Sequence, residues 1–170
     1  MKVIILAGGW GYRLGQLSES VPKPMVTIGN KPILWHIMKI YSYYGFNDFI
    51  IALGVKGDVI KNYFYNFDSR NNDFTVDLSS GDIKYHNKYN EHDWKVTLVD
   101  TGLNTLKGGR IKRLEKYLTD DINMITYGDG VGDINITELI KFHADHGKHA
   151  TLTATYPPGR FGALEINDGV

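Results

Sequence analysis

The 170-residue sequence contains no cysteine, which excludes disulfide frameworks, thiol nucleophiles and zinc-thiolate sites. It has no excess of charge, because 19 basic residues balance 19 acidic ones, and so nothing favours nucleic acid or an anionic membrane as a partner. Its apolar runs are shorter than the ~18 residues of a membrane span, and the apolar start is too short for a signal-peptide core. We therefore expect a cytoplasmic protein that holds anionic ligands by a local cluster of charges.

Short apolar runs alternate with amphipathic segments along the chain. This alternation is typical of an α/β fold with a doubly wound, mostly parallel sheet flanked by helices. The hydrophobic content of 42% is enough for one core, since a chain of this length buries roughly 70% of its unfolded surface. We predict a single domain over 1–170, with strands at 3–6, 49–53, 96–99, 123–127 and 150–156.

Helix signals fall between the predicted strands. Pro32 suits a first helical position, followed by an apolar stripe as far as Gly45. Asn135 and Glu138 are spaced like a capping box, with Gly147 after the helix end. The polar segment 68–95 interrupts the alternation and predicts a hairpin or lid. The predicted helices are 32–45, 59–67, 111–118 and 136–146.

A glycine-rich segment, LAGGWGYRLG over 6–15, directly follows the first predicted strand. Glycines at 8, 9 and 11 allow positive φ and a close approach to a ligand, so that successive N–H groups can surround phosphate oxygens. Arg13 and Lys23 would add positive charge; the ordinary alternative is that both are solvated surface residues. Lys23 is further restricted by a proline on each side. The spacing matches neither the P-loop nor the dinucleotide-binding pattern.

The segment TYGDGVGD over 126–133 places Asp129 between two glycines at the end of a predicted strand. An exposed carboxylate there suits a hard cation such as Mg²⁺, so we predict Asp129 as a metal ligand. The alternative is that Asp129 only begins a turn, since Gly-Asp-Gly is ordinary turn composition. We expect Asp133 to cap the following helix rather than to bind metal.

The glycine-rich segment and the run VPKPM over 21–25 closely resemble the signature of the sugar-1-phosphate nucleotidyltransferases, L-A-G-G-x-G-T-R-L followed by P-K-P-M. The runs at 31–38, 99–102, 108–110 and 157–164 look like the glucose-1-phosphate cytidylyltransferase branch of that family. The resemblance spans the chain and implies a GT-A-like nucleotidyltransferase fold with Mg²⁺ as cofactor. It also implies transfer of CMP from CTP to a phosphate monoester, with glucose 1-phosphate as the first candidate, giving CDP-glucose and pyrophosphate.

The resemblance further implies particular site residues. Thr105 and Arg110 should lie by the cytidine and its phosphates, with the backbone of 6–8 holding the base edge; the alternative for Arg110 is a solvated helix face. Tyr12 departs from the family threonine, and its ring is too large for the same space. The predicted catalytic residues are Arg13, Lys23 and Asp129, with Asp129 as metal ligand. The predicted nucleotide-binding residues are Leu6, Ala7, Gly8, Gly9, Trp10, Gly11, Tyr12, Arg13, Lys23, Thr105, Arg110 and Gly128.

Family members are longer than this chain, and the resemblance implies a second metal aspartate and much of the sugar pocket beyond Val170. Two interpretations of the sequence stay open. The first is a cytidylyltransferase acting on glucose 1-phosphate or on another acceptor, such as a different sugar 1-phosphate or phosphoglutamine. The second is a nucleotide-binding module that does not catalyse. An aromatic content of 12% predicts, in addition, a homo-oligomer.

Overall fold

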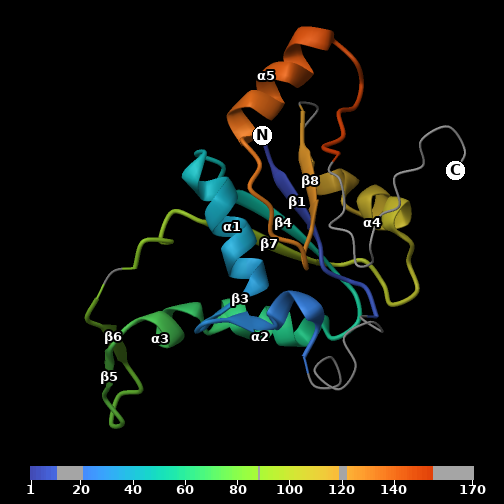
Figure 1. Cartoon of the computed structure of the whole chain (residues 1–170). Coiled ribbons are helices and arrows are strands. Elements are labelled where there is room, and N and C mark those ends of the chain that lie inside the picture. Colours follow the sequence, from blue (N-terminus) through green and yellow to red (C-terminus); the bar gives the residue numbers. More distant parts are fainter. Residues whose placement is uncertain (11–20, 88, 119–121, 155–170) are drawn as a thin grey trace, which may run out of the picture. The chain divides into compact units, whose positions relative to one another are not determined.

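A central parallel sheet organises the computed structural model, which describes residues 1–10, 21–87, 89–118 and 122–154. The sheet has the order β7-β4-β1-β8, and every neighbouring pair is parallel (Figure 1). Four of the predicted strands are confirmed to within one residue. They are β1 (Val3–Leu6), β4 (Asp48–Leu53), β7 (Lys95–Asp100) and β8 (Met124–Tyr127).

The chain divides into two compact units, Met1–Asp133 and Ile134–Val170. The first contains the sheet, and the single domain expected over 1–170 stays a prediction. Helices connect the strands, as the doubly wound fold requires. They are α1 (Ile33–Tyr43), α2 (Gly57–Tyr65), α3 (Phe67–Asn71) and α4 (Lys107–Arg113), with short 3₁₀ turns η2 (Lys23–Met25) and η3 (Glu115–Tyr117). The helix of the second unit, α5 (Ile136–His146), follows β8.

The central strands β1 and β4 are apolar on both faces because helices cover both faces of the sheet. On one face, Ile4, Ile50 and Val99 form a buried cluster with Leu114, which follows α4. The neighbouring residues of the same strands point to the other face, since side chains alternate along a strand. There the Phe49 ring lies 5.5 Å from that of Trp94. Figure 1 accordingly shows α1 and α4 on opposite sides of the sheet.

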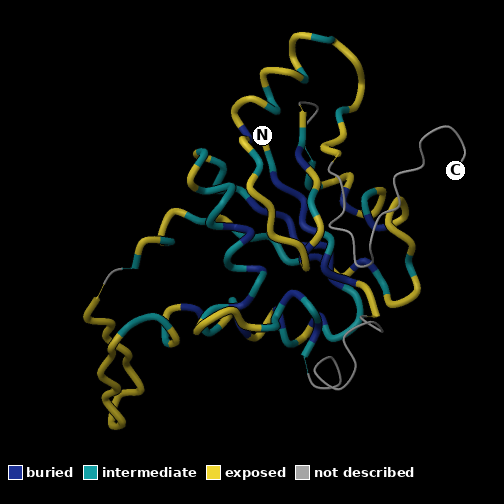
Figure 2. Tube along the Cα trace, viewed as in Figure 1, coloured by how far each residue is buried: buried dark blue, intermediate teal, exposed yellow. Residues whose placement is uncertain are grey.

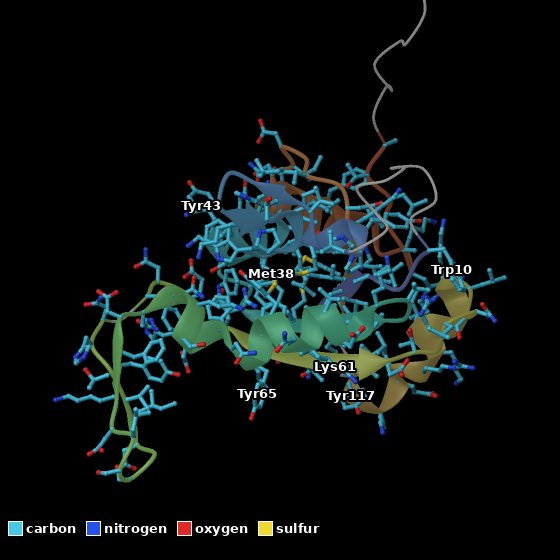
Figure 3. The ribbon with its side chains drawn as sticks, turned by 90° about the horizontal axis from the view of Figure 1, so that it is seen from below. Trp10, Met38, Tyr43, Lys61, Tyr65 and Tyr117 are labelled. Atoms are coloured by element: carbon cyan, nitrogen blue, oxygen red, sulfur yellow. The ribbon has the colours of Figure 1, made fainter. Side chains whose placement is uncertain are left out.

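Trp94 joins the sheet to the helices on the second face. Its ring lies 6.3 Å from Trp35 of α1 and 6.4 Å from Phe67 of α3, between centroids. Its indole N–H donates to Ser42 Oγ at 3.0 Å, which satisfies the polar atom of a large ring that is mostly apolar. Figure 3 shows Met38 inside this packing, and Figure 2 shows the buried centre along β1 and β4.

Three of the predicted helices have different bounds in the structure. Pro32 is not helical but pairs with Thr27, because Lys31–Pro32 (β3) forms a short antiparallel ladder with Thr27–Ile28 (β2). The helix predicted at 59–67 is split into α2 and α3. The helix predicted from residue 111 begins at Lys107, so it includes Gly108 and Gly109, which have low helix propensity and misled the prediction. It ends early, with η3 in place of its last turns.

The second unit confirms one helix and corrects two predictions. In α5 the side chain of Asn135 accepts a hydrogen bond from the backbone N–H of Glu138 at 3.1 Å, and Gly147 ends the helix with φ of 60°. Asn135 is therefore the cap, and the expectation that Asp133 caps this helix was wrong. The predicted strand at 150–156 is absent over the described residues 150–154. There Thr151 Oγ1 bonds both His143 and His146, so it folds back on α5 instead of entering a ladder.

The polar segment 68–95 contains the expected hairpin, formed by β5 (Phe74–Val76) and β6 (Ile83–Tyr85). It projects away from the sheet in Figure 1, and Figure 2 shows it exposed along its length. Phe74 pairs with Tyr85 with their ring centroids 5.7 Å apart. Over the described ranges, helices long and apolar enough to cross a membrane are absent.

The burial of Tyr63 predicts that alkaline pH lowers the stability of the protein. Burial raises the pKa of Tyr63 to about 12, and within the described part of the chain its hydroxyl has no hydrogen-bond partner. In the unfolded chain a tyrosine ionises near pH 10. The contribution of Tyr63 to the free energy of unfolding is therefore fully present below pH 10. It falls as the pH rises from 10 towards 12, because in that range only the unfolded state loses the tyrosine proton.

At pH 8 the free energy of unfolding of Tyr63→Phe should lie within about 1 kcal/mol of that of wild type, since the hydroxyl that the variant removes has no hydrogen-bond partner among the described residues. At pH 11 it should be the more stable of the two. Urea unfolding of both proteins at the two pH values measures this. An identical loss of stability in both proteins would show that Tyr63 does not contribute.

Candidate active site

A cavity of about 620 Å³ lies at the carboxyl ends of β1 and β8. The chain runs from β1 outwards to β4 and β7 and then returns to β8 on the other side of β1, so this is the point where the strand order reverses. In open α/β sheets, ligands bind at this position. The cavity is lined by Leu6, Ala7, Gly8, Gly9, Trp10, Lys23, Pro24, Leu103, Asn104, Thr105, Leu106, Lys107, Arg110, Tyr127 and Asp129.

The predicted site residues gather here. Every predicted site residue that the structure describes lines the cavity, except Gly128. Both chain neighbours of Gly128, Tyr127 and Asp129, line it. Gly11, Tyr12 and Arg13 lie outside the described residues. A larger hollow of about 820 Å³ is lined by α2, α3 and β7, away from these residues. The smaller cavity is therefore the candidate site.

The start of the glycine-rich segment is held by the sheet. Gly128 N–H donates to Leu6 O at 3.0 Å, and Ala7 N–H donates to Ala52 O at 3.0 Å, so these groups extend the ladders of the sheet. Gly8 and Gly9 do not take the positive φ that glycine allows, since the described glycines with positive φ are 29, 45, 81, 102 and 147. Gly8 is needed for close packing, because a Cβ there would lie on the guanidinium of Arg110.

Lys23 and Asp129 come together across the cavity from distant parts of the sequence. Their Nζ and Oδ2 atoms are 3.8 Å apart, with Lys23 mostly buried and Asp129 more exposed. Lys23 begins the 3₁₀ turn η2 after Pro22, and buried Pro24 holds that turn against the sheet. A Cβ on Gly128 would lie 3.0 Å from Pro24 Cγ, which is tighter than an ordinary contact, so glycine lets the end of β8 approach this turn closely.

Asp129 fits the role expected of a Mg²⁺ ligand in part. Its carboxylate is a hard oxygen donor at the cavity, and Mg²⁺ is commonly held by one or two carboxylates, water and substrate phosphates. Among the described residues there is no group of three or more histidine, cysteine, aspartate or glutamate side chains that could hold a metal. The residues present therefore suit a metal that is shared with a phosphate ligand, and Asp129 is the group that would hold it.

The segment between β7 and α4 forms another wall of the cavity. It turns at Gly102, where φ is 86° and the backbone N–H donates to Asp100 Oδ1 at 2.8 Å. Thr105 lines the cavity, as predicted, and its Oγ1 accepts from Arg113 Nη1 at 2.7 Å. The same guanidinium nitrogen donates to Thr101 O at 2.6 Å. This wall is therefore fixed by side-chain hydrogen bonds rather than by strand pairing.

Arg110 lines the cavity with the other predicted residues, and it is not the solvated residue of the alternative interpretation. Its side chain is 5% exposed, which excludes a solvated helix face, and its terminal nitrogens bond atoms of the protein itself. Burial lowers the pKa of Arg110, and the neighbouring charge of Arg113 adds to the effect while Asp100 opposes it. Its acceptors are Leu53 O at 3.0 Å, Thr101 Oγ1 at 2.7 Å, Gly102 O at 2.7 Å, Gly8 O at 2.8 Å and Leu103 O at 3.2 Å.

Six residues that line the cavity were not predicted from the sequence: Pro24, Leu103, Asn104, Leu106, Lys107 and Tyr127. Lys107 Nζ lies 5.1 Å from the centre of the Tyr127 ring, which joins the start of α4 to the end of β8 by a cation–π contact. Tyr127 could have been found, since it ends a predicted strand beside Gly128. Lys107 carries no such signal, because it is one of several basic residues around two glycines. Trp10, which was predicted, is half exposed at the cavity and lies beside α4 in Figure 3.

Comparison with known proteins agrees with this geometry. Residues 2–169 match the nucleotidyl transferase family. The chain belongs to that family. It is 55% identical over 170 residues to the glucose-1-phosphate cytidylyltransferase of Salmonella typhimurium and 44% identical to the probable glucose-1-phosphate cytidylyltransferase of Bacillus subtilis. These matches cover 99% and 100% of the chain but 66% of each relative, so the chain spans slightly less than two thirds of their length.

Solved structures share the nucleotidyl transferase fold. HddC from Yersinia pseudotuberculosis, solved as a complex with GMP-PN, has a TM-score of 0.61 and 27% identity, over 85% of this chain and 54% of that one. A UDP-glucose pyrophosphorylase solved with UDP-glucose has a TM-score of 0.63 over 86% of this chain and 54% of its own. At 17% identity the second likeness concerns the fold alone. The predicted fold class is confirmed.

Proposed function

We propose that the protein is a cytidylyltransferase that transfers CMP from CTP to a phosphate monoester, with glucose 1-phosphate as the preferred acceptor. The products would be CDP-glucose and pyrophosphate. The observation that carries this proposal is the cavity at the reversal of strand order, where Lys23 and Asp129 lie 3.8 Å apart beside the glycine-rich segment. The 55% identity to a glucose-1-phosphate cytidylyltransferase supports the choice of nucleotide and acceptor.

The charges of the reactants explain why these residues suffice without a general base. A sugar 1-phosphate has a second pKa of about 6, so it is already a dianionic nucleophile near neutral pH. The obstacle is its repulsion by the triphosphate. Lys23 and Arg13 would offset negative charge at the α-phosphate. Backbone N–H groups of the glycine-rich segment would hold the departing pyrophosphate.

The pair of Lys23 and Asp129 would also orient the reactants. Their ion pair holds the lysine amine at the cavity wall, and the turn between Pro22 and Pro24 limits where the amine can move. Asp129 would hold Mg²⁺, which supplies further positive charge to the phosphates. Such fixed charges cost no reorganisation during the reaction, which is the usual source of the largest catalytic effect.

An acceptor panel tests the reaction. Pyrophosphate release should be measured with CTP and glucose 1-phosphate, other sugar 1-phosphates or phosphoglutamine, and with UTP in place of CTP as the control. We expect CTP with glucose 1-phosphate to give the highest kcat/KM. A different best acceptor would keep the cytidylyltransferase assignment and change its substrate. CTP binding without pyrophosphate release from any acceptor would instead favour a nucleotide-binding module.

Two further expectations stay predictions. The exposed rings of Tyr43 and Tyr65 are compatible with a homo-oligomer, and light scattering of the purified protein would measure its mass in solution. Tyr65 points away from the body of the ribbon in Figure 3. A cytoplasmic location is proposed from the expected substrates, and fractionation of cells would test it.

A further inference from the structure

Arg110 makes the densest set of polar contacts around the cavity. Its two terminal nitrogens, Nη1 and Nη2, together carry four hydrogens, and these are shared among five oxygen acceptors. The acceptors lie at the ends of three different strands: Gly8 follows β1, Leu53 ends β4, and Thr101, Gly102 and Leu103 follow β7. Four of the acceptors are backbone carbonyls and one is a hydroxyl, so none of the five is a carboxylate.

We infer that Arg110 is a positioning residue that holds the ends of β1, β4 and β7 together and so builds the cavity before a nucleotide enters. This inference rests on the proposed function for the identity of the ligand. A phosphate that met the terminal nitrogens directly would have to displace backbone carbonyls that are buried around them. Those carbonyls would then lack a donor, which is unfavourable for buried groups.

Two glycines support the same role. A Cβ on Gly8 would lie on the Arg110 guanidinium, and a Cβ on Gly54 would lie 2.6 Å from its Nη1. Gly8 and Gly54 follow β1 and β4, so both strand ends leave room for the guanidinium. In this structure the first glycine of the glycine-rich segment therefore makes room for an arginine of the same chain.

Further hydrogen bonds link the same segments at the ends of β1, β4 and β7 to one another. Thr101 donates its hydroxyl to Leu53 O at 2.6 Å while accepting from Arg110, and Val55 N–H donates to Gly8 O at 3.4 Å. Arg113 holds the next turn through Thr101 O. Loss of Arg110 would thus release three loops at once, including the one that carries the glycine-rich segment.

The test compares ligands with and without phosphates. The variant Arg110→Lys keeps a positive charge but cannot reach five acceptors, because an ammonium carries three hydrogens at one point. If Arg110 positions the loops, the Kd values of cytidine and of CTP should rise by the same factor, about tenfold or more. If Arg110 instead contacts phosphate, the substitution should weaken the binding of CTP and leave the affinity for cytidine unchanged. Lys112→Ala, on the exposed side of the same helix, is the matched control.

Hydrogen exchange gives a second measurement that does not depend on the ligand. In Arg110→Lys, exchange should accelerate in the segments 7–9, 53–55 and 101–105 of the free protein, while the strand centres stay protected as in wild type. Gly8→Ala, which keeps the arginine but displaces its guanidinium, should accelerate exchange in the same segments. Guanidinium ion added to Arg110→Ala at a non-denaturing concentration should restore part of the protection.

The outcomes separate the two proposals. Unchanged exchange in both Arg110→Lys and Gly8→Ala would overturn the positioning role, as would loss of CTP affinity with cytidine affinity intact. If wild type binds neither cytidine nor CTP, the proposed function fails, and the exchange measurement alone then decides whether Arg110 holds the loops. If Arg110→Lys does not fold, Gly8→Ala decides in its place.

Discussion

Replacing Lys23 with alanine should lower kcat by about 100-fold or more while the protein stays folded. Lys23 Nζ lies at the cavity wall, 3.8 Å from Asp129 Oδ2, where the α-phosphate of a triphosphate is proposed to sit. A charge that stabilises the transition state more than the bound substrate changes kcat, whereas one that only anchors substrate changes KM. Steady-state pyrophosphate release at saturating CTP distinguishes the two effects.

A matched control is available within the chain. Lys95 Nζ lies 3.9 Å from Asp48 Oδ2, in an ion pair of similar length that lies outside the cavity and has a more exposed lysine. Lys95→Ala should therefore leave kcat close to that of wild type, since exposed ion pairs contribute little to stability. A folded Lys23→Ala protein with kcat within threefold of wild type would remove Lys23 from the catalytic residues.

Replacing Asp129 with asparagine should abolish the dependence of turnover on Mg²⁺ and most of the turnover itself. Asparagine keeps the size of the side chain but removes the negative charge that a hard cation requires. Binding of CTP without metal should persist, because Lys23 and the glycine-rich segment remain. It should even tighten, since Lys23 no longer shares its charge with a carboxylate.

Calorimetric titration with CTP, with and without Mg²⁺, measures both parts of this expectation. Asp48→Asn serves as the control, because it removes a carboxylate from the matched pair outside the cavity. If Mg²⁺ strengthens CTP binding to Asp129→Asn as much as to wild type, the metal is held elsewhere. Asp133 would then be the next residue to change.

Much of the sheet could be predicted from the sequence because buried parallel strands appear there as continuous apolar runs. The runs at 3–6 and 49–53 are apolar at every position, and a segment covered on both faces must be so. The run at 150–156 shows the limit of that reasoning. A strand also needs a partner edge, and in residues 150–154 the side chain of Thr151 bonds two histidines of α5 instead.

The location of the site could be predicted from the sequence, but only some of the contacts between its residues could. Glycines after a strand and a carboxylate after another strand must meet at one edge of a parallel sheet, which is why Asp129 was found. The pairing of Asp129 with Lys23 depends on the packing of Pro24 against Gly128, which involves residues far apart in the sequence. The burial of Arg110 could not be predicted either, because only the folded chain brings its carbonyl acceptors together.

Titration of the 170-residue protein with CTP and with UTP shows whether this cavity binds cytidine nucleotides. Cytosine and uracil differ in their donor and acceptor pattern, and a mismatched buried hydrogen bond costs about 1–3 kcal/mol. We therefore expect saturable binding of CTP, at least about tenfold tighter than that of UTP. Absence of CTP binding, or equal affinity for both nucleotides, would contradict it.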